Sequence, residues 1–261
     1  FKQKTAYEIP KRDWSSDVCS SDLAALARGH AVTIVSGPVQ VAYPRRARVI
    51  PVVTTGEMLE ASLAELPRVN GVIAAAGKAA FLHYAAVGGP RTDGGQGLAV
   101  VQAAKAGGAT VTCDLISPQP TAVAELERLL PHVDYFMPSA SEALALANAD
   151  SLEAAADFFL GLGAGGVIIK NGGEGSFVAV GTDRTRLPAY AITPIDTTSC
   201  GDSYCAGFIA ALGRGLPILD AARFATAVAA LVAQGLATLG KLESYERTLE
   251  AMETMALKDA A

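Results

Sequence analysis

The sequence predicts an α/β protein with a mainly parallel β-sheet that is covered by helices on both faces. From about residue 31 to residue 236, apolar runs of strand length alternate with segments of helical spacing. Strands separated by helix-length segments are typical of parallel sheets, which are buried between two layers of helices. Ligands of such sheets bind beyond the carboxyl ends of the strands, so a functional site is expected in the loops that follow them.

The expected elements follow one another along the chain. Apolar runs predict strands at 31–37, 47–53, 71–76, 109–115, 133–137, 165–170 and 175–180. Apolar residues at three- and four-residue spacing predict helices at 56–66, 95–106, 121–130, within 139–160, at 201–213 and at 217–236. The clearest loop is the glycine-rich segment 88–97.

The composition excludes several classes of function. The 261 residues are 51% hydrophobic and 18% charged, which is enough to bury a large core. The net charge of −5 gives no basis for a nucleic acid or an anionic membrane as partner. No apolar run reaches the roughly 18 residues of a membrane span. The cysteines show no metal spacing and are expected to be reduced thiols of a cytoplasmic protein, and all three histidines are expected to be structural. The cysteines are Cys19, Cys113, Cys200 and Cys205.

The first 23 residues do not have the pattern of a folded protein or of a signal peptide. Back-translated, 2–9 and 13–23 resemble the two arms of a short-read sequencing adapter, with Pro10 to Arg12 in the position of the index. Residues 1–23 are therefore expected to be a non-native, adapter-like tail. The alternative is a natural disordered tail.

The segment DTTSCGDSYCAGF, from Asp196 to Phe208, carries the strongest chemical signal. Small residues lead into an apolar-periodic helix, whose N-terminus offers free backbone N–H groups and a partial positive charge. The amides of Ser199, Cys200 and Gly201 can form an anion hole for a phosphoryl group, and Asp202 can take a proton from an attacking hydroxyl. The alternative is that Asp202 only caps the helix, and spacing alone does not separate the two.

This segment resembles the C-terminal signature of the ribokinase/PfkB family of carbohydrate kinases, D-T-T-G-A/C-G-D-x-F-x-A-G-F. The similarity extends over about residues 80–240 and includes DYFMPSASEALAL, VIIKNGGEGSF and ARFATAVAALVAQGL. The resemblance implies a ribokinase-like three-layer αβα fold and ATP-dependent phosphorylation of a sugar or nucleoside. It also implies Mg2+ and a monovalent cation as further ligands, and it allows a homodimer. The family's sugar-binding N-terminal part and small β lid do not appear in the sequence, so they are expected to be missing or replaced.

The resemblance assigns roles to individual positions. Asp202 is the catalytic base, and Ser199, Cys200 and Gly201 form the anion hole. Lys170, Gly172, Gly175 and Ala229 lie near ATP, Glu142 helps to organise magnesium, and Asp196 and Thr198 lie near the monovalent cation. Ser199 stands where the family has glycine, so a positive φ would be strained there. Ser139 replaces the asparagine of N-x-x-E, and 139–142 also fits a capping box, so Glu142 has a structural alternative. Lys170 could reach a phosphate or be a solvated strand end.

The segment 24–77 has a different resemblance. GHAVTIVSGPV and TTGEMLEA are similar to phosphopantothenoylcysteine synthetase of coenzyme A biosynthesis. The expected domains are therefore the tail 1–23, a βαβ fragment at 24–77 and a kinase core at 78–261. The alternative is an unusual kinase N-terminal region that shares the βαβ pattern. Two other functions stay open beside the kinase: a nucleotide-dependent ligase, which rests on 24–77 alone, and an inactive nucleotide-binding remnant.

Overall fold

The computed structural model describes residues 33–36, 48–51, 72–87, 93–115, 122–236 and 239–258. The chain divides into two compact units, Phe1–Val72 and Ile73–Ala261. In the first unit, β1 (Thr33–Ser36) and β2 (Arg48–Pro51) pair in parallel, and each falls within an expected strand. The adapter-like tail and the helix expected at 56–66 lie outside the described residues. The domain boundary expected at residue 77 stays a prediction.

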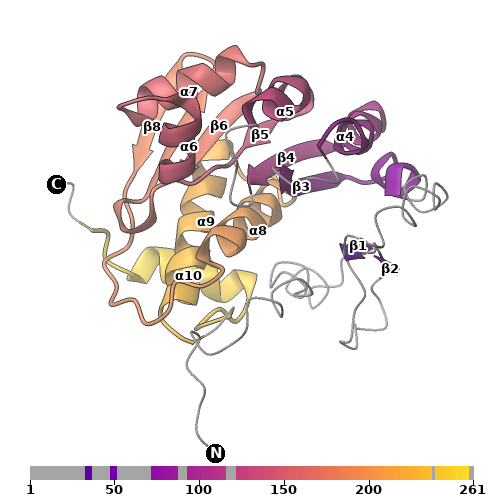
Figure 1. The fold of residues 1–261 in the computed structure, drawn as a ribbon. Helices are drawn as coiled ribbons and strands as arrows, with labels where there is room; N and C mark the ends of the chain where they lie inside the picture. The colour runs from indigo at the N-terminus through magenta and orange to yellow at the C-terminus, as the bar shows by residue number, and fades with distance from the viewer. Residues whose placement is uncertain are drawn as a thin grey trace, which may run out of the picture. The chain divides into compact units, whose positions relative to one another are not determined.

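The second unit is built on a six-stranded sheet in the order β3-β4-β5-β6-β7-β8 (Figure 1). Its strands are β3 (Phe81–Val87), β4 (Thr110–Leu115), β5 (Tyr135–Phe136), β6 (Gly166–Lys170), β7 (Ser176–Val180) and β8 (Asp183–Leu187). The pairs from β3 to β6 are parallel, whereas β7 and β8 extend the sheet by antiparallel pairing. The expected mainly parallel sheet is confirmed.

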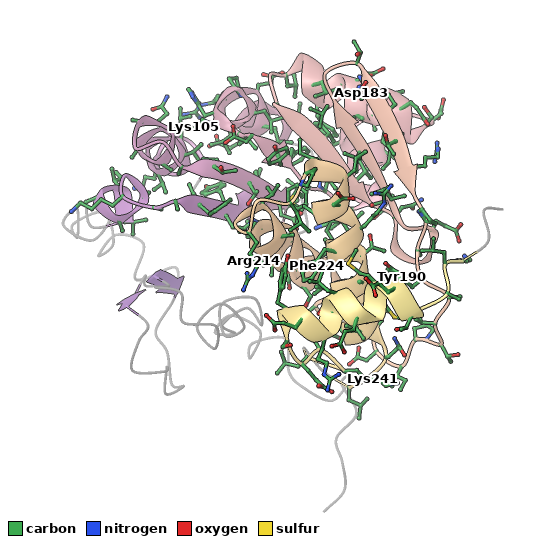
Figure 2. All side chains as sticks on the ribbon, turned by 180° about the vertical axis from the view of Figure 1, so that it is seen from behind. Lys105, Asp183, Tyr190, Arg214, Phe224 and Lys241 are labelled. Carbon is green, nitrogen blue, oxygen red and sulfur yellow. The ribbon has the colours of Figure 1, made fainter. Side chains whose placement is uncertain are left out.

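Helices cover both faces of this sheet, as expected (Figure 1). On one face the helices are α4 (Gln96–Ala106), α5 (Ala122–Leu129), α6 (Ala140–Ala147) and α7 (Leu152–Gly161), with the 3-10 turn η3 (Leu130–His132). On the other face they are α8 (Cys200–Leu212), α9 (Ile218–Ala233) and α10 (Tyr245–Thr254). Figure 2 shows this second layer from its own side, with Phe224 and Arg214 within it. Each face buries its own apolar core, so the unit is a three-layer αβα structure.

The helix that carries the signature segment is fixed by close packing of α8 on α9. Gly207 of α8 has no side chain, and a Cβ at this position would lie 3.1 Å from the Cα of Ala225 and 2.9 Å from Cγ2 of Val228. The absence of a side chain lets the two helices approach closely, and this contact holds α8 against the neighbouring helix. The position of the N-terminus of α8 therefore follows from the packing of its middle turn.

The structure differs from the sequence-based expectation in a few elements. The expected strand at 71–76 is wrong: residues 72–76 form a helix, because three consecutive alanines favour helix more than strand. β3, β8 and α10 were not expected from the pattern. β3 has a histidine and a tyrosine in its centre, which interrupt the apolar run. Within the described part of the chain, no helix combines the length and apolarity that crossing a membrane requires.

Candidate functional site

The segment before α8 forms a hydrogen-bonded turn against the end of α9. Ile195 donates its N–H to the carbonyl of Ala233 at 2.7 Å. Oδ1 of Asp196 accepts the N–H of Thr198 at 2.9 Å, which closes an Asx turn. Cys200 then donates its N–H to the carbonyl of Thr197 at 3.2 Å. Of the three amides expected in the anion hole, that of Cys200 thus has an acceptor within the turn.

α8 begins with a residue in a left-handed conformation. Ser199 is the N-cap, with φ 59° and ψ 11°, and its side chain makes no capping hydrogen bond. The first intrahelical bond runs from the N–H of Ser203 to the carbonyl of Ser199 at 2.9 Å. The amides of the first turn, including that of Gly201, therefore lie at the positive end of the helix dipole. The positive φ expected at Ser199 is confirmed, and a non-glycine residue there costs about 1 kcal/mol.

Asp202 is an exposed residue in the first turn of α8. Ser199 is the N-cap, so Asp202 lies at the third helical position, and its role as catalytic base stays a prediction. The charge of Asp202 acts on both His83 and Cys205, so the carboxylate belongs to a polar cluster above the sheet. A carboxylate in the first helical turn is also favoured by the helix dipole.

Lys170 extends from the end of β6 into this cluster. Its ammonium forms an ion pair with Oδ2 of Asp114 and donates to Sγ of Cys205 at 3.6 Å. The Lys170 side chain is only 12% exposed and that of Asp114 only 6%, so the alternative of a solvated strand end is wrong. The Lys170 Nζ also lies 3.6 Å from the point where a Cβ of residue 201 would stand. A cation therefore sits beside the first turn of α8.

Burial and neighbouring charges shift the ionisation of these groups. Burial alone would lower the pKa of Lys170, but Cys205 and the carboxylates of Asp114 and Glu142 outweigh it, and the pKa is raised. Burial, followed by the charge of Asp114, raises the pKa of the Cys205 thiol. The thiol is accordingly a donor, with Sγ 3.3 Å from Oδ2 of Asp114. The cluster thus brings the amine of Lys170, the thiol of Cys205 and the carboxylate of Asp114 into contact.

His83, together with Asp114 and Cys205, provides ligand atoms that could bind a metal ion. One ligand atom each from His83, Asp114 and Cys205 lies within 4.8 Å of the others. The ammonium of Lys170 already pairs with Asp114, and the thiol of Cys205 donates to the same carboxylate, so a metal ion would have to displace the ammonium and the thiol proton. His83 Nδ1 lies 2.8 Å from the hydroxyl of Thr112. The arrangement therefore favours an internal lysine cation over a metal ion at this point.

Glu142 forms the capping box that the sequence indicates. Its Oε2 accepts the N–H of Ser139 at 2.9 Å and the hydroxyl of Ser139 at 2.6 Å. In return, the N–H of Glu142 donates to the Ser139 hydroxyl at 3.4 Å. Ser139 also forms a parallel bridge with Lys170. The structural role of Glu142 is confirmed, and the same contacts bring the N-terminus of α6 next to Lys170.

The expected nucleotide-binding positions flank α8. Gly172 and Gly175 bound the turn η4 (Gly172–Glu174) between β6 and β7. Gly175 has φ 89°, and a Cβ there would lie 1.9 Å from the carbonyl oxygen of Leu187, so only glycine fits. The carbonyl of Ala229 on α9 accepts the Cys200 thiol at 3.7 Å. The C-terminal segment also reaches this region, because Lys258 donates its Nζ to the carbonyl of Gly173 at 3.1 Å.

The structure thus brings most of the expected positions together around the first turn of α8. Asp114, Cys205 and His83 were not expected in the site. Asp114 had one detectable signal, since it is a carboxylate at the end of a buried apolar strand. His83 was expected to be structural, and it lies instead in the electrostatic field of Asp202 and Lys170.

Comparison with known proteins identifies the family. The family "pfkB family carbohydrate kinase" matches residues 52–244, which is more than half of the chain. The chain belongs to the pfkB family of carbohydrate kinases. The match begins at residue 52, inside the segment that resembles the synthetase.

Several pfkB relatives are similar to this chain over part of their length. The 2-dehydro-3-deoxygluconokinase of Bacillus subtilis is 33% identical over 134 residues, covering 49% of this chain and 41% of that protein. The ribokinase of Staphylococcus aureus is 29% identical over 143 residues, covering 52% of this chain and 46% of that protein. The chain therefore spans about half the length of the curated pfkB relatives it matches.

Solved structures confirm the ribokinase-like fold. An Escherichia coli protein assigned as ribokinase II, in complex with ATP and Mg2+, has a TM-score of 0.58 at 21% identity, covering 67% of this chain and 58% of that chain. The ribokinase of Thermotoga maritima has a TM-score of 0.52 at 26% identity, covering 60% and 53%. The aminoimidazole riboside kinase of Salmonella enterica, complexed with aminoimidazole riboside and an ATP analogue, has a TM-score of 0.59 at 18% identity, covering 67% and 63%.

Proposed function

We propose that this pfkB chain transfers the γ-phosphoryl group of ATP to a hydroxyl of a sugar or nucleoside. The observation that carries the proposal is that Asp202, a carboxylate, and Lys170, a buried cation, both lie at the N-terminal turn of α8. Phosphoryl transfer needs a group that orients or deprotonates the attacking hydroxyl and donors that stabilise charge on the phosphoryl oxygens. The names of the relatives, which include sugar and nucleoside kinases, support the same reaction class.

In the proposed reaction, Asp202 accepts the proton of the attacking hydroxyl. A bond forms between the hydroxyl oxygen and the γ-phosphorus, the bond from the γ-phosphorus to the β,γ-bridging oxygen breaks, and ADP leaves. The amides of Ser199 and Gly201 are proposed to bind the charged phosphoryl oxygens, whereas the amide of Cys200 would first have to leave the carbonyl of Thr197. The ammonium of Lys170 neutralises part of the phosphate charge, because a cation at a low-dielectric site acts more strongly than one in water.

The other expected positions are proposed to bind the nucleotide and cations. Gly172, Gly173 and Gly175 have no side chains, so the backbone of the β6–β7 turn can approach a nucleotide, and Ala229 contributes a small residue on α9. Glu142 offers a carboxylate, the ligand type that Mg2+ prefers, and would hold the ion through water while its Oε2 caps α6. When bound, Mg2+ supplies charge neutralisation of the phosphates. Asp196 and Thr198 are proposed to lie near a monovalent cation.

The test is ADP release from MgATP in the presence of ribose, cytidine, fructose or 2-dehydro-3-deoxygluconate, with each substrate offered separately. We expect turnover that depends on one of these hydroxyl compounds, and a loss of about 100-fold or more for Asp202→Asn. The matched control is Asp220→Asn, which removes an exposed carboxylate from α9 that pairs with Arg223 on the surface. Binding of MgATP without turnover would indicate a nucleotide-binding remnant and would contradict the kinase proposal.

A further inference from the structure

The ion pair between Asp114 and Lys170 joins two strands that lie far apart in the sequence. Asp114 is the penultimate residue of β4 and Lys170 is the last residue of β6, and both side chains are nearly buried, at 6% and 12% exposed. Lys170 Nζ has one further contact among the described residues, the thiol of Cys205 at 3.6 Å. Cys205 in turn donates to the same oxygen of Asp114. Asp114 is therefore the common acceptor that fixes the position of the ammonium.

We propose that Asp114 is a positioning residue, which holds the Lys170 ammonium beside the first turn of α8 as a fixed cation for the nucleotide phosphates. This inference rests on the phosphoryl transfer proposed above. Lys170 Nζ lies 3.6 Å from where a Cβ of Gly201 would stand, so the ammonium and the helix N-terminus present positive charge to the same space. Without Asp114, a flexible lysine in this place would have other acidic partners.

Those other partners explain why a fixed position matters. Asp202 and Cys205 on α8, Glu142 on α6 and His83 on β3 all lie within electrostatic range of the cluster. An ammonium that turned to Asp202 would neutralise the proposed base. An ammonium held by Asp114 leaves Asp202 available for the hydroxyl proton, and it needs no reorganisation when the phosphates bind.

Asp114 also keeps Lys170 charged. Burial favours the neutral amine, whereas Cys205, Asp114 and Glu142 favour the ammonium and raise its pKa. Asp114→Asn removes a negative charge and a charge-assisted hydrogen bond from the amine, so the pKa of Lys170 falls. The proposed phosphate cation would then be lost progressively as the pH rises.

The experiment measures MgATP affinity by calorimetry and thermal stability for wild type, Asp114→Asn, Lys170→Met and the double variant. We expect each single variant to weaken MgATP binding about tenfold and to lower the melting temperature, because each leaves a buried charge or dipole without its partner. The double variant should regain most of the melting temperature, yet its MgATP affinity should stay weak. A double variant that regains both would show a purely structural pair and would overturn the proposal.

A pH series adds a readout that a structural role would not change. Between pH 7.5 and pH 9.5, wild-type MgATP affinity should be nearly constant, whereas that of Asp114→Asn should fall as the pH rises. Combining Asp114→Asn with Lys170→Arg should abolish this pH dependence, since arginine keeps its charge. The matched control is Asp134→Asn, which breaks the Lys105–Asp134 pair beside the start of β4 and should leave the wild-type profile unchanged.

The outcomes separate this inference from the proposed function. If wild type does not bind MgATP, the proposed function fails and the positioning role falls with it. If wild type binds MgATP and Lys170→Met binds equally tightly, only the positioning role is overturned. Should a single variant fail to fold, the double variant still tests the positioning role, because it contains no unpaired buried charge. Wild-type MgATP affinity in the double variant would contradict the proposal.

Discussion

Gly207 of α8 lies directly against Ala225 of α9, with no room for a side chain between the two backbones. Gly207→Leu should therefore force the helices apart and lower the free energy of unfolding by about 1–3 kcal/mol. Chemical denaturation measures this change. Gly161→Ala is the control: a Cβ at the end of α7 meets nothing within 4 Å, so this change should stabilise the protein slightly. Equal stability of Gly207→Leu and wild type would contradict the close helix contact.

Ser199 adopts a conformation that glycine adopts without strain. Ser199→Gly should raise the free energy of unfolding by about 1 kcal/mol, because φ is 59° at this position. Ser199→Val should lower it, since a β-branched residue is disfavoured there. Asn148 is the other described non-glycine residue with positive φ, and Asn148→Gly serves as the control at the end of α6. A loss of stability in Ser199→Gly would show that the serine side chain has a stabilising contact that outweighs the strain.

Glu142 has two proposed roles that substitution can separate. Ser139→Ala should cost about 1 kcal/mol of stability through loss of the cap, whereas Glu142→Gln should keep the capping box and most of the stability. If Glu142 also organises Mg2+, Glu142→Gln should raise the Mg2+ concentration needed for half-maximal turnover. Denaturation and a magnesium titration measure the two effects. A Glu142→Gln variant with an unchanged magnesium requirement would leave the carboxylate only its capping role.

His83 makes stability depend on pH in a defined direction. Desolvation, followed by the charge of Lys170, lowers the pKa of His83 from its ordinary value of 6.5 to about 4. The unfolded chain then binds the proton more readily than the folded chain, so stability is complete above pH 6.5 and falls as the pH falls toward 4. Because His83 is an exposed residue, solvent screening weakens this effect, and the slope should stay below the single-proton limit of about 1.4 kcal/mol per pH unit.

The measurement is urea denaturation at several pH values between 7.5 and 4.5. His83→Gln should remove the histidine contribution and leave a shallower dependence, which carboxylates alone produce. Identical slopes for wild type and His83→Gln would show that His83 titrates normally in the folded chain.

The regular elements of the second unit could be predicted because their signals are local. The helices at 96–106 and 122–129 and the strands β6 and β7 follow from patterns within a few residues, although the antiparallel pairing of β6 with β7 was not expected. β3 was missed because His83 and Tyr84 interrupt its apolar run. The helix at 72–76 was mistaken for a strand because five small or apolar residues carry no period.

The polar cluster could be predicted only in part. The signature segment places Asp202 and its neighbours on one helix turn, so their proximity is local. The Lys170–Asp114 pair spans 56 residues and the Cys205–Asp114 contact spans 91. These contacts depend on which strands become neighbours in the sheet, and no spacing within the sequence encodes that order. The sequence therefore gives no indication that the buried lysine and the carboxylate near the end of β4 form a pair.

The C-terminal segment has a practical consequence for producing the protein. Lys258 donates its N–H to the carbonyl of Ala189 at 2.8 Å, and its Nζ reaches the carbonyl of Gly173 in the β6–β7 turn. An affinity tag fused shortly after Lys258 would therefore start beside a contact with the turn proposed to face ATP. A cleavable fusion, removed before nucleotide titrations, keeps foreign residues away from that turn.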